Sequence, residues 1–133
     1  MQVAASMMKT HPHPVSTSDA WAECINACFD CTQACIACAD ACLGEEHLQN
    51  LTRCIRLDYD CADICQTTGK MLTRQTEPEP RLLSAQLEVC RMVCEICGRE
   101  CEKHQDQHEH CRVCAQACRE CQQHCDTLIR QMH

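Results

Sequence analysis

The chain has 133 residues and a formal net charge of −7, which suits one domain with its own core and leaves little room for a second. The negative charge and the scarcity of aromatic residues argue against a nucleic-acid partner, which would require a basic surface. Eighteen residues are cysteine, so the interior must be built largely from sulfur. Such a content is typical of secreted disulfide scaffolds or, inside the cell, of metal-binding proteins.

The N-terminal sequence MQVAASMMKTHPHPVSTSD does not resemble an export signal, because it lacks an apolar run and is interrupted by prolines and histidines. No segment approaches the ~20 apolar residues of a membrane span. We therefore expect a cytoplasmic protein with no membrane partner, in a compartment that keeps thiols reduced. There a cysteine array more often binds metal than forms disulfide bonds.

Glycine and proline are scarce, with three and four copies, so we predict a mostly helical chain. Residues 1–17 are expected to form an N-terminal tail or a short added element. The main domain is expected to span residues 18–133. Its first helix is predicted from about residue 19 to residue 43, with a stop at Gly44.

Three further helices are predicted downstream. The second runs from about residue 46 to 75 and ends at the break TEPEP, and the third runs from about residue 80 to 104. The polar stretch at 103–110 contains the last turn, and the fourth helix ends near Gln131. Four helices with short connections predict an all-α fold, an antiparallel up-down-up-down four-helix bundle with a Cys-lined core.

The cysteines recur at alternating spacings of three and four residues, which place them along one seam of each helix. These positions hold leucine or isoleucine in an ordinary bundle, whereas here they hold thiols. The cysteines that we predict as metal ligands are Cys24, Cys28, Cys31, Cys35, Cys38, Cys42, Cys54, Cys61, Cys65, Cys90, Cys94, Cys97, Cys101, Cys111, Cys114, Cys118, Cys121 and Cys125.

The same seam changes character beyond the cysteines. Antiparallel connectivity then gathers apolar residues at one end of the bundle and histidines at the other, which predicts a plugged end and an imidazole-rich mouth. The apolar positions are Trp21, Leu72, Leu83, Leu87, Leu128 and Met132, and the histidine positions are His47, His104 and His108.

Neither disulfide bonds nor an inert core explains this seam well. Neighbours three or four apart on a helix have Cβ atoms ~5–6 Å apart, whereas a disulfide bond needs ~3.5–4.5 Å. Disulfide bonds between helices remain possible, but pairing all eighteen cysteines would use up a regular array that cross-linking alone does not need. Leucine would stabilise a core more than cysteine does, because it buries more area and a fully buried leucine side chain contributes ~1.5–3 kcal/mol. Metal binding is therefore the better explanation.

The ligand type then narrows the choice of metal, since thiolates suit Cu(I), zinc and iron–sulfur clusters. Iron–sulfur motifs usually place their cysteines on loops. Zinc needs closed sets of four ligands, and no spacing here separates such sets. Cu(I) accepts two or three sulfurs and shares thiolates. About one Cu(I) per cysteine would therefore fill the seam and neutralise its thiolate charge.

Three motifs, CINACFDCTQACIACADAC, CIRLDYDCADIC and GRECEKHQDQHEHCRVCAQAC, together resemble the bacterial cytosolic copper storage proteins. The resemblance covers the chain from about residue 20 onward and leaves out the 17-residue N-terminal extension. It implies a Cys-lined four-helix bundle that stores many Cu(I) ions, has no catalytic activity and assembles into a homotetramer. It also implies metal ligation by all eighteen cysteines and by His104, His108 and His110. Copper-exchanging thiols or chaperones are the partners that we expect.

Two kinds of acidic residue are predicted to behave differently. Asp58 occupies the seam position between Cys54 and Cys61, so we expect it to be buried and to hydrogen-bond neighbouring thiols rather than to bind metal itself. Rotation of its helix toward solvent, or toward an arginine such as Arg53 or Arg56, is the alternative. Glu45 and Glu100 are predicted to be ordinary solvated helix surface.

The alternative function is zinc or general soft-metal buffering. An enzyme fits less well, because the sequence has no Ser/His/Asp set, no phosphate-binding glycine loop and no isolated reactive cysteine beside a resolving partner. We therefore predict no catalytic residue.

Overall fold

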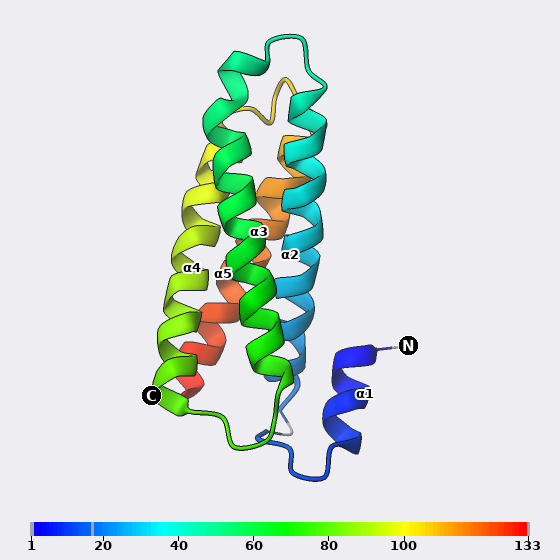
Figure 1. The fold of residues 1–133 in the computed structure, drawn as a ribbon, viewed down its shortest axis with the longest axis vertical. Helices are drawn as coiled ribbons and strands as arrows, with labels where there is room; N and C mark the ends of the chain where they lie inside the picture. Colours follow the sequence, from blue (N-terminus) through cyan, green and yellow to red (C-terminus); the bar gives the residue numbers. More distant parts are fainter. Residues whose placement is uncertain (1, 17, 133) are drawn as a thin grey trace.

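The computed structural model describes residues 2–16 and 18–132. Four long helices run antiparallel to one another: α2 (Asp19–Leu43), α3 (Thr52–Thr73), α4 (Pro80–Glu102) and α5 (Glu109–Met132). Each packs against its two neighbours in a ring, as α2 with α3, α3 with α4, α4 with α5 and α5 with α2 (Figure 1). No strand occurs in the described part of the chain. The predicted all-α four-helix bundle is confirmed.

The helix ends follow local sequence signals. Pro80 begins α4 at a position where its missing N–H is not needed, and the Glu79 side chain accepts a hydrogen bond from the Arg81 N–H at 3.2 Å. Gly44 ends α2, as predicted, and its N–H donates to the Ala41 carbonyl at 3.0 Å. Its φ of −88° is an ordinary right-handed value, so this stop does not use the left-handed freedom of glycine.

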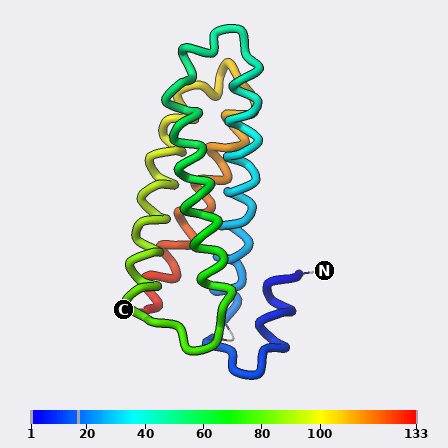
Figure 2. Tube along the Cα trace, viewed as in Figure 1, coloured from blue at the N-terminus to red at the C-terminus, as the bar shows by residue number. Residues whose placement is uncertain are grey.

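The predicted second helix begins later than expected. A short 3-10 helix, η1 (Leu48–Leu51), precedes α3 and buries Leu51 against the bundle. The connections from α2 to α3 and from α4 to α5 lie at the same end of the molecule, while the connection from α3 to α4 lies at the opposite end (Figure 2). The topology therefore brings residues 44–51 and 103–110 together. We call these two segments the mouth.

The N-terminal extension forms a helix, α1 (Val3–Thr10), beside the end of the bundle at which α2 begins (Figure 1). Met8 is buried in the same apolar cluster as Trp21. The buried side chain of Gln75 accepts a hydrogen bond from the Val15 N–H at 2.9 Å, which ties the extension to the bundle. Of the two expected forms, the structure has the short added element. The expected domain boundary at residue 17 lies outside the described residues.

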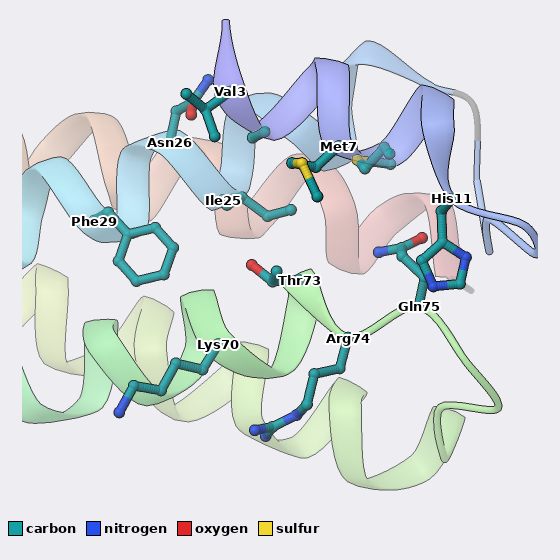
Figure 3. A pocket seen from close by; sticks show the side chains of 12 residues that line it. Val3, Met7, His11, Ile25, Asn26, Phe29, Lys70, Thr73, Arg74 and Gln75 are labelled. Atoms are coloured by element: carbon teal, nitrogen blue, oxygen red, sulfur yellow. The ribbon is translucent and has the colours of Figure 1, made fainter.

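A pocket of about 450 Å³ lies between α1 and the neighbouring faces of α2 and α3 (Figure 3). Its walls carry Met7 on α1, Ile25 and Phe29 on α2, and Lys70 on α3. Its lining, where the structure describes it, holds no cysteine. The pocket is therefore separate from the thiol core.

Candidate metal centre

All eighteen cysteines point into the space enclosed by the four long helices, and none is more than 1% exposed. All of them are free thiols. The 3.5-residue spacing explains this arrangement, because it keeps successive cysteines on the inward face of each helix. The structure thus brings together every cysteine that the sequence singled out.

The sulfur atoms touch one another across the α2–α3, α3–α4 and α2–α5 interfaces. Sulfur atoms of α4 and α5 lie within 4.8 Å of one another. The Sγ–Sγ distance is 3.5 Å between Cys65 and Cys94, and 3.7 Å between Cys54 and Cys101. Cys114 and Cys35 approach to 3.7 Å. These distances are far longer than the ~2.05 Å of a disulfide bond. The core is therefore a continuous lattice of thiols without covalent cross-links.

Groups of four sulfurs lie close enough together to hold metal. Within each group, all the sulfur atoms lie within 4.8 Å of one another. Groups share members, so that Cys31, Cys35, Cys118 and Cys121 each belong to two of them. Five such groups are Cys28, Cys90, Cys121 and Cys125; Cys31, Cys65, Cys94 and Cys121; Cys31, Cys35, Cys61 and Cys118; Cys35, Cys97, Cys114 and Cys118; and Cys38, Cys42, Cys54 and Cys111.

This sharing bears on the choice of metal. Separate zinc sites would each need four thiolates of their own. A thiolate that belongs to two groups can instead bridge two ions, which suits Cu(I) and its preference for few soft ligands. The lattice therefore fits a cluster of bridged monovalent ions better than a row of isolated tetrahedral sites.

Burial opposes ionisation of the thiols in the empty lattice. Burial raises the pKa of the Cys42 thiol to about 12, because a thiolate in a low-dielectric interior loses its hydration. Cys42 belongs to the group of four nearest the mouth. Metal binding must therefore displace protons from these sulfurs.

Asp58 is buried among the thiols, as predicted, with no exposed surface. Its Oδ1 accepts hydrogen bonds from the thiols of Cys97 at 3.3 Å, Cys114 at 3.4 Å and Cys101 at 3.6 Å. Burial raises the pKa of Asp58 to about 9, against the lowering effect of the Cys97 hydrogen bond. The carboxyl group is thus in contact with thiols of α4 and α5 from its own position on α3.

Neither arginine considered as an alternative partner reaches Asp58. Arg56 forms an ion pair with Asp60 at 3.1 Å on the surface of α3. Arg53 approaches Glu100 at 3.6 Å. The alternative of a solvent-facing or arginine-paired Asp58 is therefore wrong.

The predicted histidines gather at the mouth. His104 Nε2 donates to Glu100 Oε2 at 3.0 Å, while His108 and His110 both lie against Glu45. His110 Nδ1 lies 3.4 Å from the Cys38 sulfur, so this ring joins the thiol lattice directly. His47 is exposed and lines a pocket of about 600 Å³ that His104 and His108 also line.

The prediction that Glu45 and Glu100 are ordinary solvated surface is wrong. Glu100 is only 7% exposed and binds His104, Lys103 and Arg53. Glu45 is half-buried between two histidine rings. The Glu100–His104 contact spans one helical turn, so the i, i+4 pattern could have revealed it. No local pattern could have revealed Glu45, because its partners lie more than sixty positions away in the sequence.

The opposite end of the core is closed, as the seam predicted. Leu72 and Leu87 have no exposed surface, and Leu128 is 1% exposed. Trp21 is buried and its indole N–H donates to the Leu72 carbonyl at 2.9 Å. The predicted seam residues Leu83 and Met132 also pack at this end, where Leu83 is buried and Met132 half-buried. We call this layer the closed end.

None of the helices in residues 2–16 and 18–132 is long and apolar enough to cross a membrane.

Comparison with known proteins agrees with this geometry. The family model described as copper storage protein matches residues 17–130. The cysteine-rich protein YhjQ of Bacillus subtilis (strain 168) is 40% identical over 105 residues, which cover 79% of this chain and 92% of that protein.

Two solved structures extend the comparison. The copper storage protein Ccsp from Streptomyces lividans, loaded with 10 copper equivalents, is 46% identical, with a TM-score of 0.92 over 96% of this chain and 98% of that one. The metal-free copper storage protein Csp3 from Bacillus subtilis is 38% identical, with a TM-score of 0.68 over 80% of this chain and 96% of that one. The chain belongs to the copper storage protein family.

Proposed function

We propose that this protein stores Cu(I) in bulk, as a cytosolic reserve, at roughly one ion per cysteine. The observation that carries the proposal is the sharing of buried sulfurs between neighbouring groups of four. A lattice of this kind can bind many bridged ions at once, and the fold has already ordered its ligands. The solved Streptomyces lividans relatives include one described as a cytosolic copper storage protein, which supports the same location here.

The ligands that we propose are the eighteen cysteines, with His104, His108 and His110 acting at the mouth. We assign Asp58 a supporting role, in which it accepts hydrogen bonds from thiols rather than binding copper. Small thiols or copper chaperones would deliver and collect the ion at the mouth. No catalytic step is assigned, because no cysteine is presented to a substrate at the surface.

Anaerobic titration of the reduced, metal-free protein with Cu(I) tests the proposal. A chromophoric Cu(I) chelator present in competition reports the free ion. We expect saturation near one equivalent per thiol, which is about eighteen equivalents. Saturation near four or five equivalents, with zinc competing, would instead support zinc or general soft-metal buffering.

A reactivity measurement separates storage from catalysis. The storage proposal predicts that the eighteen thiols of the folded, metal-free protein react slowly with a thiol reagent, because all are buried. A single cysteine that reacted far faster than the other seventeen would point to an enzyme.

We further propose that the bundle assembles into a homotetramer. Its support is family resemblance together with an apolar row on the outer face of α4, where Val89, Met92 and Ile96 are 44%, 51% and 39% exposed. Sedimentation equilibrium tests this assembly, and a monomer at all concentrations would refute it.

The storage function is assigned to residues 18–133 and an accessory role to residues 1–17. The family model begins at residue 17, which supports this division. A variant that lacks residues 1–17 should bind the same number of Cu(I) ions. A lower copper capacity would place part of the site in the extension.

A further inference from the structure

The carboxylate of Glu45 holds two of the mouth histidines with a single oxygen. Its Oε2 lies 2.8 Å from His108 Nδ1 and 2.9 Å from His110 Nε2. The two imidazole rings are stacked, with centroids 5.5 Å apart and planes inclined by 25°. One acceptor therefore fixes the position of both rings relative to each other.

The second nitrogen of His110 faces the thiols. Its Nδ1 lies 3.4 Å from the Cys38 sulfur and 3.7 Å from the Cys111 sulfur. A neutral imidazole has only one N–H group. If the Nε2–H is donated to Glu45, the lone pair of Nδ1 is left on the side of the sulfurs, where a metal ion could use it.

The backbone ties this carboxylate to the outermost sulfurs. The Glu45 N–H donates to the Cys42 carbonyl at 3.1 Å, in the turn that ends α2. Cys42 and Cys38 belong, with Cys54 and Cys111, to the group of four sulfurs nearest the mouth. Glu45, the His110 ring and these thiols therefore form one connected unit at the entrance.

We propose that Glu45 is the positioning residue of the copper entry site. It holds His110 in the tautomer and orientation in which Nδ1 can bind an incoming Cu(I) beside Cys38 and Cys111. The ion keeps its oxidation state throughout. Its delivering ligand leaves, and each thiol that becomes a ligand loses one proton to solvent. This inference rests on the proposed storage of Cu(I).

Uptake kinetics give the first test, on the full-length protein. One equivalent of Cu(I) is transferred from a chromophoric chelator to the metal-free protein in a stopped-flow instrument. We expect Glu45→Ala to slow the transfer by about tenfold or more, as removal of a hydrogen-bond partner of a metal ligand commonly does. Glu45→Gln keeps an oxygen acceptor, so its transfer rate should lie between those of the wild type and Glu45→Ala. Glu46→Ala, at the exposed neighbouring position, is the matched control and should match the wild type.

A double-mutant cycle shows whether Glu45 acts through His110. His110→Ala should itself slow uptake, and adding Glu45→Ala to it should cause little further slowing. An equal slowing by Glu45→Ala in both backgrounds would overturn the proposal. So would wild-type uptake by Glu45→Ala.

The tautomer of His110 gives a readout that needs no metal. Long-range ¹H–¹⁵N spectra of the metal-free protein at about pH 8, where imidazole is generally neutral, should show the Nε2-protonated ring in the wild type. Glu45→Ala should lose this preference. An unchanged spectrum would overturn the positioning role even if copper storage holds. Failure of the protein to bind many Cu(I) ions would instead refute the proposed function and leave the hydrogen-bond geometry intact.

Discussion

At the scale of single residues, Asp58 shows two opposing effects on one carboxyl group. Three thiols donate hydrogen bonds to its Oδ1, and the bond from Cys97 favours the ionised form. Complete burial favours the neutral form, and burial prevails, because the pKa rises to about 9. Thiols are weak donors and offset only part of the lost hydration. Asp58 therefore destabilises the metal-free protein at any pH at which its carboxyl group is ionised in the unfolded chain and protonated in the folded one.

Replacement of Asp58 by asparagine should stabilise the metal-free protein at neutral pH. The carboxyl pKa is about 9 in the folded protein against an ordinary value of 3.8, so between these limits the folded state retains a proton that the unfolded state has lost. The free energy of unfolding of the wild type therefore falls as pH rises from about 4 to 9. Asp58→Asn removes this contribution, with a gain at pH 7 on the order of a few kcal/mol.

Thermal unfolding of the reduced proteins, measured from pH 5 to 9 in about unit steps, checks this expectation. The difference in midpoint between Asp58→Asn and the wild type should widen with pH. Asp63→Asn, at an exposed position on the same helix, should leave the profile unchanged. Parallel profiles for Asp58→Asn and the wild type would contradict the raised pKa.

At the scale of helices, one seam serves two purposes. Along its middle it carries thiols, and at the closed end it carries leucine side chains that pack tightly and exclude water. The same 3.5-residue repeat therefore supplies both the ligands and the apolar layer that stabilises the empty protein. Stability and metal capacity are thus carried by different turns of the same helices.

Truncation of Leu87, which has no exposed surface, should separate these two properties. We expect Leu87→Ala to lower the free energy of unfolding of the metal-free protein by about 2–5 kcal/mol, as for other buried leucines. The number of Cu(I) ions bound should not change. Urea unfolding and copper titration measure the two quantities. Leu82→Ala, at a position that is 60% exposed, should have little effect on either, and a loss of copper capacity in Leu87→Ala would show that the separation is wrong.

The seam also shows how far the sequence could be interpreted. Periodicity placed the four long helices, the buried thiols, Asp58 and the closed end, because each depends on which face of a helix points inward. It did not predict η1 or the packing of Met8, since both depend on tertiary contacts of short segments. Glu45 was missed for the same reason, because its contact with His110 exists only after the two connections meet.

At the scale of the whole molecule, charge governs the exchange of protons for copper. The protein has a formal net charge of −7, and eighteen thiolates would add a charge that a buried core cannot hold. The empty core therefore keeps its protons, as the raised pKa of Cys42 illustrates. Replacement of each thiol proton by one monovalent ion leaves the core charge unchanged. Filling therefore requires no large change in the electrostatics of the surrounding helices.

Copper uptake should release about one proton per Cu(I) bound near pH 7. The apparent affinity should then fall as pH is lowered, because protons compete for the same sulfurs. Titration in a weakly buffered solution with a pH indicator counts the protons directly. A control addition of Cu(I) to buffer without protein corrects for protons from the reagent. Release of about two protons per ion would instead indicate thiolates that are not shared between ions.

The closed end has a further consequence for the residence time of individual ions. Trp21, Leu72 and Leu128 block one end of the core. Copper ions can therefore enter and leave only past the histidines at the mouth. The ions bound deepest in such a core leave only after the ions bound nearer the mouth have left. Radiolabelled copper that is loaded first and followed by unlabelled copper should therefore be released late. Cells that use this reserve would release the most recently bound ions before the older ones.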